Sequence, residues 1–169
     1  PGITVPLPAY PKLDEYLAAQ GWHLSTELHC MVIDTSDFTP RTTDSQFTVK
    51  ISDEPTDTWL AVQGDMALAK IMRRYWAHYI SVLIEGQRVA TGRIAFTGGW
   101  GVITRVFVKH EYRRQGIGRI VMHTLAEVAR AQDCDRLTLQ VDSSNSPAVS
   151  LCNSLGFRLH HRDRYRVLE

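Results

Sequence analysis

The sequence predicts a protein of the α/β (α+β) class, in which short strands alternate with amphipathic helices. A hydrophobic run at residues 102–108 leads into a turn with two glycines and then into a helical run that reaches residue 130. Residues 78–84 and 88–96 are strand-like runs joined by a short turn, which is typical of a hairpin. Another strand-like run, residues 136–141, follows the long helix. The change between a period of 2 and a period of 3.6 residues favours a mixed fold.

The first 45 residues precede the most regular part of the chain. They are expected to contain an extended Pro-rich stretch at 1–9, a short helix at 13–20 that Gly21 ends, a strand at 29–34 and a polar linker at 35–45. We therefore predict an N-terminal extension of residues 1–45, followed by one main domain of residues 46–169.

The main domain shows a regular succession of elements. The helix after the two glycines places Ile117, Ile120, Val121, Leu125 and Val128 on one face. In order, the expected elements are a strand at 47–51, helices at 56–62 and 66–74, strands at 78–84, 88–96 and 102–108, the long helix, a strand at 136–141, a helix from 146 and a strand at 165–168. Residues 52–55 offer the capping residues for the first helix.

Composition narrows the class of protein. The chain has 169 residues, 44% of them hydrophobic, and a net charge of +1, so nothing favours bulk nucleic-acid binding. Three cysteines without a CxxC pair favour a reducing cytosol, and the seven scattered histidines predict no metal site. No apolar run approaches ~18 residues, and the N-terminus has no signal pattern, so we expect a cytoplasmic protein without a membrane span.

The segment Arg113-Arg114-Gln115-Gly116-Ile117-Gly118 stands between the strand and the long helix. Helix N-termini offer unpaired N–H groups to anions, and glycines let a pyrophosphate approach the backbone. The arginines, with Arg119, add charge-assisted donors. No Gly-Lys-Ser/Thr ending is present, and Gly118 is not followed by the third glycine of a dinucleotide fingerprint. A cofactor that carries a diphosphate is therefore expected.

The pattern Arg-x-x-Gly-x-Gly after a strand resembles the acyl-CoA pyrophosphate loop of the GNAT superfamily of N-acyltransferases. Alone, it is also compatible with a basic glycine turn before an ordinary helix. A second segment is similar to the family's late motif, Asn-x-x-Ala-x-x-Leu-Tyr-x-x-Leu-Gly-Phe. The residues in register are Asn145, Ala148, Leu151, Leu155, Gly156 and Phe157. The resemblance implies the GNAT fold, a mixed, mostly antiparallel twisted sheet flanked by helices, with splayed central strands.

The resemblance also implies how acetyl-CoA is bound. The backbone of Val106, Phe107 and Val108 would pair with the pantetheine arm, and an N–H of Val106 or Val108 would stabilise the oxyanion. The pyrophosphate would be bound by Arg114, Gln115, Gly116, Ile117, Gly118 and Arg119, with Arg113 either joining them or stabilising the loop. Asn145 would contact the CoA arm or, alternatively, cap the next helix.

The residues expected to move protons depart from the family pattern. Cys152 stands where many relatives carry a Tyr that protonates the leaving thiolate. It is either a proton donor, a small buried filler or, least in keeping with the family, a nucleophile. Gln140 stands where some relatives carry a Glu base, and Asp142 on the same strand face is the substitute, unless it only caps a turn. Glu85 and Tyr165 are weaker candidates, and a water chain needs no dedicated base.

The residues that would bind the amine are less defined. Aromatic and acidic side chains that suit a cationic amine are Trp59, Met66, Trp76, Tyr165, Glu54 and Asp57, although the same set fits an ordinary core and surface. Residues 160–166 are basic and suit an acidic acceptor, the CoA 3′-phosphate or a charge-protected edge strand.

The predicted function is transfer of an acetyl group from acetyl-CoA to an amine acceptor in a ternary complex, with no metal, nucleic-acid or membrane partner. The alternative is a CoA-binding domain with little catalysis. Leu17, Gly21 and Trp22 are similar to the family's Leu-x-x-x-Gly-Phe ending, so the extension is either the remnant of an earlier acetyltransferase-like repeat or a generic helix–turn–strand. A homodimer is compatible with the sequence.

Overall fold

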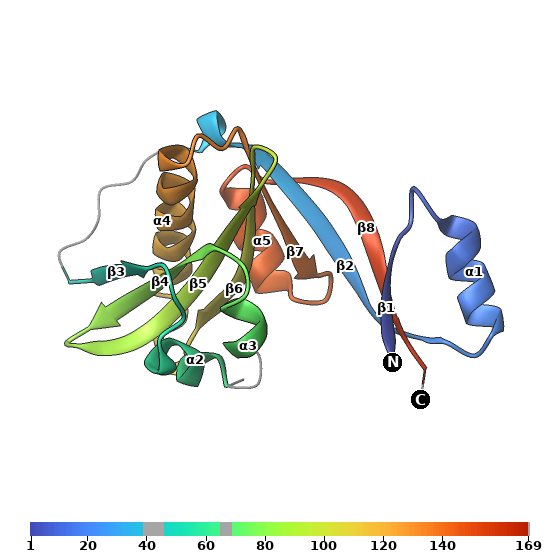
Figure 1. The fold of residues 1–169 in the computed structure, drawn as a ribbon, viewed down its shortest axis with the longest axis horizontal. Helices are drawn as coiled ribbons and strands as arrows, with labels where there is room; N and C mark the ends of the chain where they lie inside the picture. The colour runs from blue at the N-terminus through green and yellow to red at the C-terminus, as the bar shows by residue number, and fades with distance from the viewer. Residues whose placement is uncertain (39–45, 65–68, 169) are drawn as a thin grey trace. The chain divides into compact units, whose positions relative to one another are not determined.

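In the computed structural model the chain forms two compact units. The first contains Pro1–Ile33 together with Thr138–Glu169, and the second contains Asp34–Leu137. The structure describes residues 1–38, 46–64 and 69–168 (Figure 1). The units are defined by contacts, and the first combines residues from both ends of the chain. The domains predicted at 1–45 and 46–169 therefore stay a prediction.

The second unit contains the strand order β6-β5-β4-β3, and its three neighbouring pairs are antiparallel. Its strands are β3 (Thr48–Ser52), β4 (Ala77–Ile84), β5 (Gln87–Thr97) and β6 (Trp100–Val108). Its helices are η1 (Thr35–Asp37), α2 (Asp57–Gln63), α3 (Ala69–Met72), η3 (His110–Tyr112) and α4 (Ile117–Ala131). These bounds confirm the predicted strands and the long helix. Of the helix predicted at 66–74, residues 66–68 lie outside the described residues.

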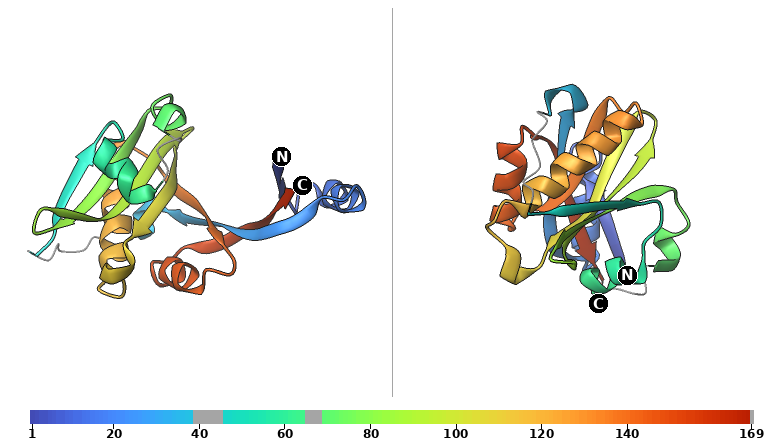
Figure 2. Two further views of the ribbon diagram at one scale, coloured as in Figure 1. Left: turned by 90° about the horizontal axis from the view of Figure 1, so that it is seen from below. Right: turned by 90° about the vertical axis from the view of Figure 1, so that its left-hand side faces the viewer.

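Helix α4 lies across one face of the second unit's sheet (Figure 2). A glycine on β5 allows this close approach. A Cβ added at Gly92 would stand 2.6 Å from Cγ1 of Val121 and 3.1 Å from Cδ1 of Leu125. The apolar stripe of α4 is buried, with Val121 and Leu125 fully inaccessible. The apolar stripe of α4 therefore packs Val121 and Leu125 against β5.

The first unit is built from two β-α-β segments. They are β1 (Gly2–Pro6), α1 (Pro11–Ala19) and β2 (His23–Asp34), then β7 (Arg136–Asp142), α5 (Ser146–Ser154) and β8 (Arg158–Val167). All of β7 from Thr138 onward belongs to this unit. The strand order is β1-β8-β2-β7, and β2 pairs antiparallel with β8. If β1 is exchanged with β7 and β2 with β8, the same order results, read from the opposite edge. The strand predicted at 165–168 is too short, because β8 begins at Arg158.

The two segments share one turn geometry. In the first, Gly21 has a φ of 83°, and the N–H of Trp22 donates to the carbonyl of Leu17 at 3.0 Å. In the second, Gly156 has a φ of 93°, and the N–H of Phe157 donates to the carbonyl of Cys152 at 3.1 Å. Both helices span nine residues and carry a Pro in their first turn. Whether the extension is a remnant of an acetyltransferase-like repeat or a generic helix–turn–strand stays a prediction.

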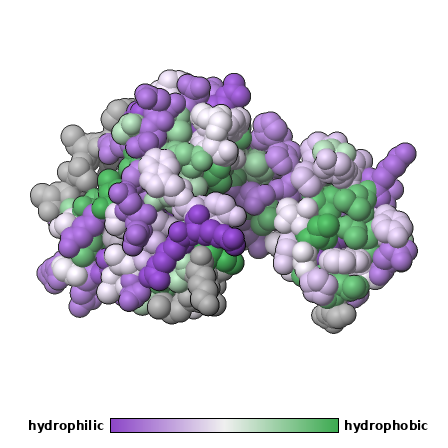
Figure 3. All heavy atoms as spheres, in the orientation of Figure 1, coloured by the Kyte–Doolittle hydropathy of each residue, from purple (hydrophilic) through white to green (hydrophobic). Residues whose placement is uncertain are grey.

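The surface of the first unit carries apolar side chains around α1 and the terminal strands (Figure 3). Leu13 and Leu24 are 39% and 49% exposed, and Tyr16 is 61% exposed. Among the helices in the described ranges, none has both the length and the hydropathy needed to cross a bilayer.

Candidate functional site

Strand β6 carries a β-bulge shortly before the arginine- and glycine-rich segment. On β5, Thr91 is opposite Phe107 and Arg93 is opposite Thr104, so two residues of β6, Arg105 and Val106, face one residue of β5. Arg105 adopts a φ of 57°, in the left-handed region that costs a side-chain-bearing residue free energy. A bulge leaves a residue of its strand outside the ladder. No local sequence signal marks this feature, since Arg105 is neither Gly nor Asn, and sequence reasoning missed it.

The loop between η3 and α4 has the backbone expected of an anion site. Arg114 and Gly116 adopt φ angles of 65° and 78°, and Gly116 is the N-cap of α4. Because Gly116 has no side chain to cap the helix, the first-turn N–H groups of Ile117 and Gly118 receive no side-chain oxygen from it. Arg114, Gln115 and Gly116 are exposed. The predicted loop and the predicted strand residues therefore belong to one unit, with Val106, Phe107 and Val108 just upstream.

Arg113 is held by the end of strand β6. Its Nε donates to the carbonyl of Val108 at 3.0 Å, and its guanidinium lies 5.9 Å from the ring centroid of Phe107. These contacts favour the loop-stabilising alternative for Arg113. Direct binding of a phosphate by this side chain stays a prediction.

Three predicted residues, Asp142, Asn145 and Cys152, lie in the first unit. Oδ1 of Asp142 accepts hydrogen bonds from the N–H and the hydroxyl of Ser144 at 2.8 and 2.7 Å, and Oδ2 accepts from Thr26 at 2.7 Å. The hydrogen bonds from Ser144 and then from Thr26 hold the pKa of the Asp142 carboxyl below its usual value. A lowered pKa makes a weaker base, so this geometry favours the turn-capping alternative.

Asn145 is the N-cap of helix α5, and Cys152 lies within that helix. The side-chain oxygen of Asn145 accepts from the N–H of Ala148 at 3.2 Å, so Asn145 caps the helix in the structure. Cys152 is 5% exposed, and burial raises the pKa of its thiol to about 11. A thiol with this pKa keeps its proton at neutral pH. It fits a proton donor or a buried filler, and it does not fit a thiolate nucleophile.

The other candidates for proton transfer are placed as follows. Gln140, which is exposed, donates from Nε2 to Oδ2 of buried Asp163, and His161 lies 3.0 Å from the other oxygen of that carboxylate. Glu85 is exposed in the turn between β4 and β5. Tyr165 is half-buried on β8, opposite Thr26 of β2. Their roles stay predictions.

The predicted amine-binding set divides between core and surface. Trp59 is 1% exposed, donates from Nε1 to the carbonyl of Ile80 at 2.9 Å and packs edge-on against Tyr79, so it is a core residue. Trp76 is 56% exposed and lies 5.1 Å from the ring of Phe96. Glu54 and Asp57 are exposed, and Met66 lies outside the described residues. Of the two interpretations of Trp59, the structure therefore favours an ordinary core position.

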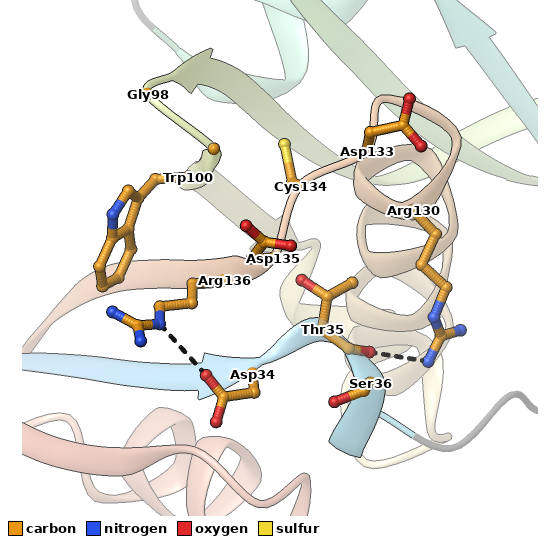
Figure 4. Close-up of a pocket in the computed structure, with 11 residues that line it drawn as sticks. Asp34, Thr35, Ser36, Gly98, Trp100, Arg130, Asp133, Cys134, Asp135 and Arg136 are labelled. Carbon is orange, nitrogen blue, oxygen red and sulfur yellow. Dashed lines mark hydrogen bonds and ion pairs between the residues drawn. The ribbon is translucent and has the colours of Figure 1, made fainter.

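A cavity of about 840 Å³ lies at the opposite end of α4 from the loop (Figure 4). It is lined by η1, by the turn between β5 and β6 and by residues 133–136. Arg136 contacts Asp34 at 3.3 Å and stacks over Trp100, and Arg130 donates to the carbonyl of Thr35 at 3.0 Å. Since a 15-residue helix is about 22 Å long, this cavity is separate from the anion loop. No predicted site residue lines it.

Metal-ligating side chains do not gather in the described part of the chain, where no group of three or more His, Cys, Asp or Glu residues could hold an ion. All three cysteines are free.

A mixed α/β fold with a bulged strand, an arginine- and glycine-rich turn and a helix N-terminus defines a protein of the acyltransferase class. Residues 41–157, more than half of the chain, match the model of the acetyltransferase (GNAT) family. The protein belongs to this family.

Relatives agree with this assignment. The chain is 27% identical over 172 residues to YobR of Bacillus subtilis, named an uncharacterized N-acetyltransferase, covering 94% of this chain and 70% of that protein. It is also 43% identical over 53 residues to the thialysine N-epsilon-acetyltransferase of Sus scrofa, covering 31% of each. The first comparison spans both units, whereas the second is local.

Solved structures share the fold. A GCN5-related N-acetyltransferase from Kribbella flavida superposes with a TM-score of 0.79 at 16% identity, covering 98% of this chain and 66% of that one. A tandem GNAT protein from the clavulanic acid biosynthesis pathway gives a TM-score of 0.73 at 14% identity, covering 98% of this chain and 62% of that one. The chain thus spans about two thirds of the length of these proteins, and the likeness shows the fold alone.

Proposed function

We propose that the protein transfers an acetyl group from acetyl-CoA to a primary amine of a small molecule or peptide, by direct attack in a ternary complex. The observation that carries the proposal is the succession of the β6 bulge, the loop at 113–116 and the uncapped N-terminus of α4 within one unit. Loop and helix supply donors for a pyrophosphate, and the bulge supplies a backbone N–H for a carbonyl oxygen.

The reaction needs few side chains. The amine nitrogen attacks the thioester carbon, the carbonyl oxygen becomes an oxyanion, and the C–S bond then breaks to release the CoA thiolate. An N–H at Val106 or Val108 stabilises the oxyanion, because a donor aimed at developing charge lowers the barrier. The amine gives up a proton to water or a base, and the thiolate takes up a proton. The buried thiol of Cys152 is the proposed donor for this last step.

The nature of the acceptor is proposed from chemistry and likeness together. The thialysine acetyltransferase, by its name, acts on a primary amine of an amino acid, and it resembles this chain over 53 residues. Direct attack needs an uncharged amine, so the rate is expected to rise with pH until the acceptor is neutral. We therefore propose a compact primary amine and extend the test to peptides.

The test is thioester turnover. Acetyl-CoA and the protein are mixed with polyamines, amino acids, and N-terminal and lysine peptides, and free thiol is followed at several pH values. Amine-dependent thiol release, together with a mass increase of the amine, is the expected result. Failure of the wild-type protein to bind acetyl-CoA would overturn the proposal.

A second candidate, a CoA-binding domain with little catalysis, is favoured by one observation. The position at which some relatives carry a Glu base holds Gln140, whose amide is engaged with Asp163. Acetyl-CoA binding without thiol release for any amine in the panel would support this candidate.

A further inference from the structure

The β6 bulge is contacted by the last residue of α2. Nε2 of Gln63 donates to the carbonyl oxygen of Arg105 at 2.9 Å and to the hydroxyl oxygen of Thr91 at 2.5 Å. Gln63 is half-buried and Thr91 is fully buried. One side-chain amide thus joins helix α2, strand β5 and the bulged residue of β6.

The orientation of this amide is dictated by its partner. A backbone carbonyl only accepts hydrogen bonds, so the NH₂ end of Gln63 and not its oxygen faces Arg105. Gly64 then ends the helix with a φ of 68°, and its N–H donates to the carbonyl of Ala61 at 3.3 Å. The position of Gln63 is therefore set by a capped helix end.

The bulge needs such support. Arg105 is in the left-handed region, which disfavours a residue with a side chain, and strained backbone persists only where its surroundings hold it. On the other face of the sheet, Gly92 admits Val121 and Leu125 of α4 against the strand that faces the bulge. The bulge is thus held by α2 through a hydrogen bond and stands next to the strand on which α4 packs.

We propose that Gln63 is a positioning residue for acyl transfer: its hydrogen bond to the Arg105 carbonyl holds the β6 bulge in the shape that aims the Val106 N–H at the acyl oxygen. The inference rests on the proposed function, because the aim of this N–H matters only when a thioester is bound beside it. In the proposed function the arginine- and glycine-rich loop binds the CoA phosphates, so a change at Gln63 is expected to act on kcat and not on the Kd.

The test uses three substitutions at one position. Gln63→Leu removes the donor and keeps most of the volume, Gln63→Glu presents only acceptors to the carbonyl, and Gln63→Lys keeps a donor of similar reach. The matched control is Gln132→Leu, at an exposed position just after α4. For each variant kcat, the Kd for acetyl-CoA and the amide hydrogen exchange of residues 105–107 are measured.

The Leu and Glu variants are expected to lower kcat by about 10- to 100-fold, the range for a misplaced catalytic group, while the Kd changes by less than about threefold. Exchange of the Val106 and Phe107 amides is expected to accelerate in both, whereas the Lys variant and the control stay near the wild type. A preference for Lys over Glu is a readout that mere packing would not give.

Two failures are distinguishable. If the wild type is active and Gln63→Leu leaves both kcat and exchange unchanged, the inference is overturned and the proposed function stands. If the wild type neither binds acetyl-CoA nor releases thiol, the proposed function is overturned, and with it the catalytic role of Gln63. Exchange at residues 105–107 then decides only whether Gln63 holds the bulge.

Discussion

Arg166 of β8 donates two hydrogen bonds to the carboxylate of Asp14 in α1, which lies 152 residues away in sequence. Nε lies 2.6 Å from Oδ1 and Nη2 lies 3.0 Å from Oδ2. Both residues are buried, and Arg164 adds a contact of 2.7 Å to Oδ2. The hydrogen bond from Arg166 is the main reason that the pKa of the Asp14 carboxyl lies below its usual value. The N-terminal helix is thus fixed to the last strand by a buried ion pair.

Removal of this carboxylate is expected to destabilise the protein. Asp14→Asn leaves Arg166 buried without its counter-charge, and breaking such a pair costs about 3 kcal/mol or more of unfolding free energy at pH 7. A lowered folded-state pKa gives stability that is complete above the unfolded value and is lost as pH falls through the folded one. Urea unfolding between pH 7 and pH 2.5 should therefore show a steeper acid loss in the wild type than in the variant.

The control for this experiment is Asp57→Asn, which breaks the exposed pair with Arg73 at 3.4 Å. Exposed pairs contribute about 0–1 kcal/mol, so this variant should unfold almost as the wild type does. Equal losses for both variants would contradict the assignment of the Asp14 pair as a buried anchor.

The anion loop can be tested at its glycine N-cap. Gly116→Ala places a Cβ on a residue with a φ of 78° at the N-terminus of α4, where the phosphates are proposed to bind. We expect the Kd for acetyl-CoA to rise at least about tenfold, because both the turn and the approach to the backbone are disturbed. Calorimetric titration with acetyl-CoA measures this change.

Gly86→Ala is the matched control, since Gly86 has a φ of 81° in the hairpin between β4 and β5 and no atom within 4 Å of an added Cβ. It introduces a comparable backbone strain away from the loop. If both substitutions change the Kd equally, the loss reflects general strain and not the loop.

The repeated turns of the first unit give a further prediction. Gly21→Ala and Gly156→Ala each place a side chain in the left-handed region, at a cost of roughly 1–2 kcal/mol in unfolding free energy. Gly156→Ala should cost more, because its Cβ would lie 3.2 Å from Cδ1 of Ile33, whereas Gly21 has free space. Urea unfolding measures both. A larger loss at Gly21 would contradict the steric argument.

The sequence was sufficient for elements whose signal is local. The glycines at 116 and 118 and the apolar stripe from Ile117 onward predicted the loop and α4, because each signal lies within a few residues. Strand β8 was predicted too short because charged residues hide its alternation. Its inward-facing Arg166 is balanced by Asp14, a partner that no local window contains.

The bulge shows the same limit at the site. Arg105 adopts its unusual backbone beside Gln63 and Gly92, which are distant in sequence, so nothing near position 105 predicts it. The candidate base was also read from strand position alone. Of the two partners of Asp142, Ser144 is two residues away and fits the turn-capping alternative, whereas Thr26 is 116 residues away and became known only from the fold.

Substitution of Asp142 distinguishes a general base from a turn-capping residue. Asp142→Asn keeps the shape but weakens acceptance from Ser144 and Thr26. We expect a lower melting temperature and an unchanged pH profile of kcat/KM, because a carboxyl with a lowered pKa is ionised across the working range and gives no limb there. A loss of rate of about 100-fold or more, with an unchanged melting temperature, would instead identify Asp142 as the base.

Substitution of Cys152 tests the proposal that this thiol donates the proton to the leaving thiolate. With a pKa of about 11, the thiol is ionised in only about one molecule in ten thousand at pH 7, so it holds a proton that it can donate. Cys152→Ala is expected to lower kcat several-fold and Cys152→Ser less, with no pH limb from this residue between pH 6.5 and 9.

Cys134→Ala, which removes another buried free thiol, is the control and should leave kcat unchanged. Intact mass after incubation with acetyl-CoA alone should show no acetyl adduct. Such an adduct on Cys152 would contradict direct transfer, and full activity of the Ala variant would leave Cys152 as a buried filler and assign the proton to water.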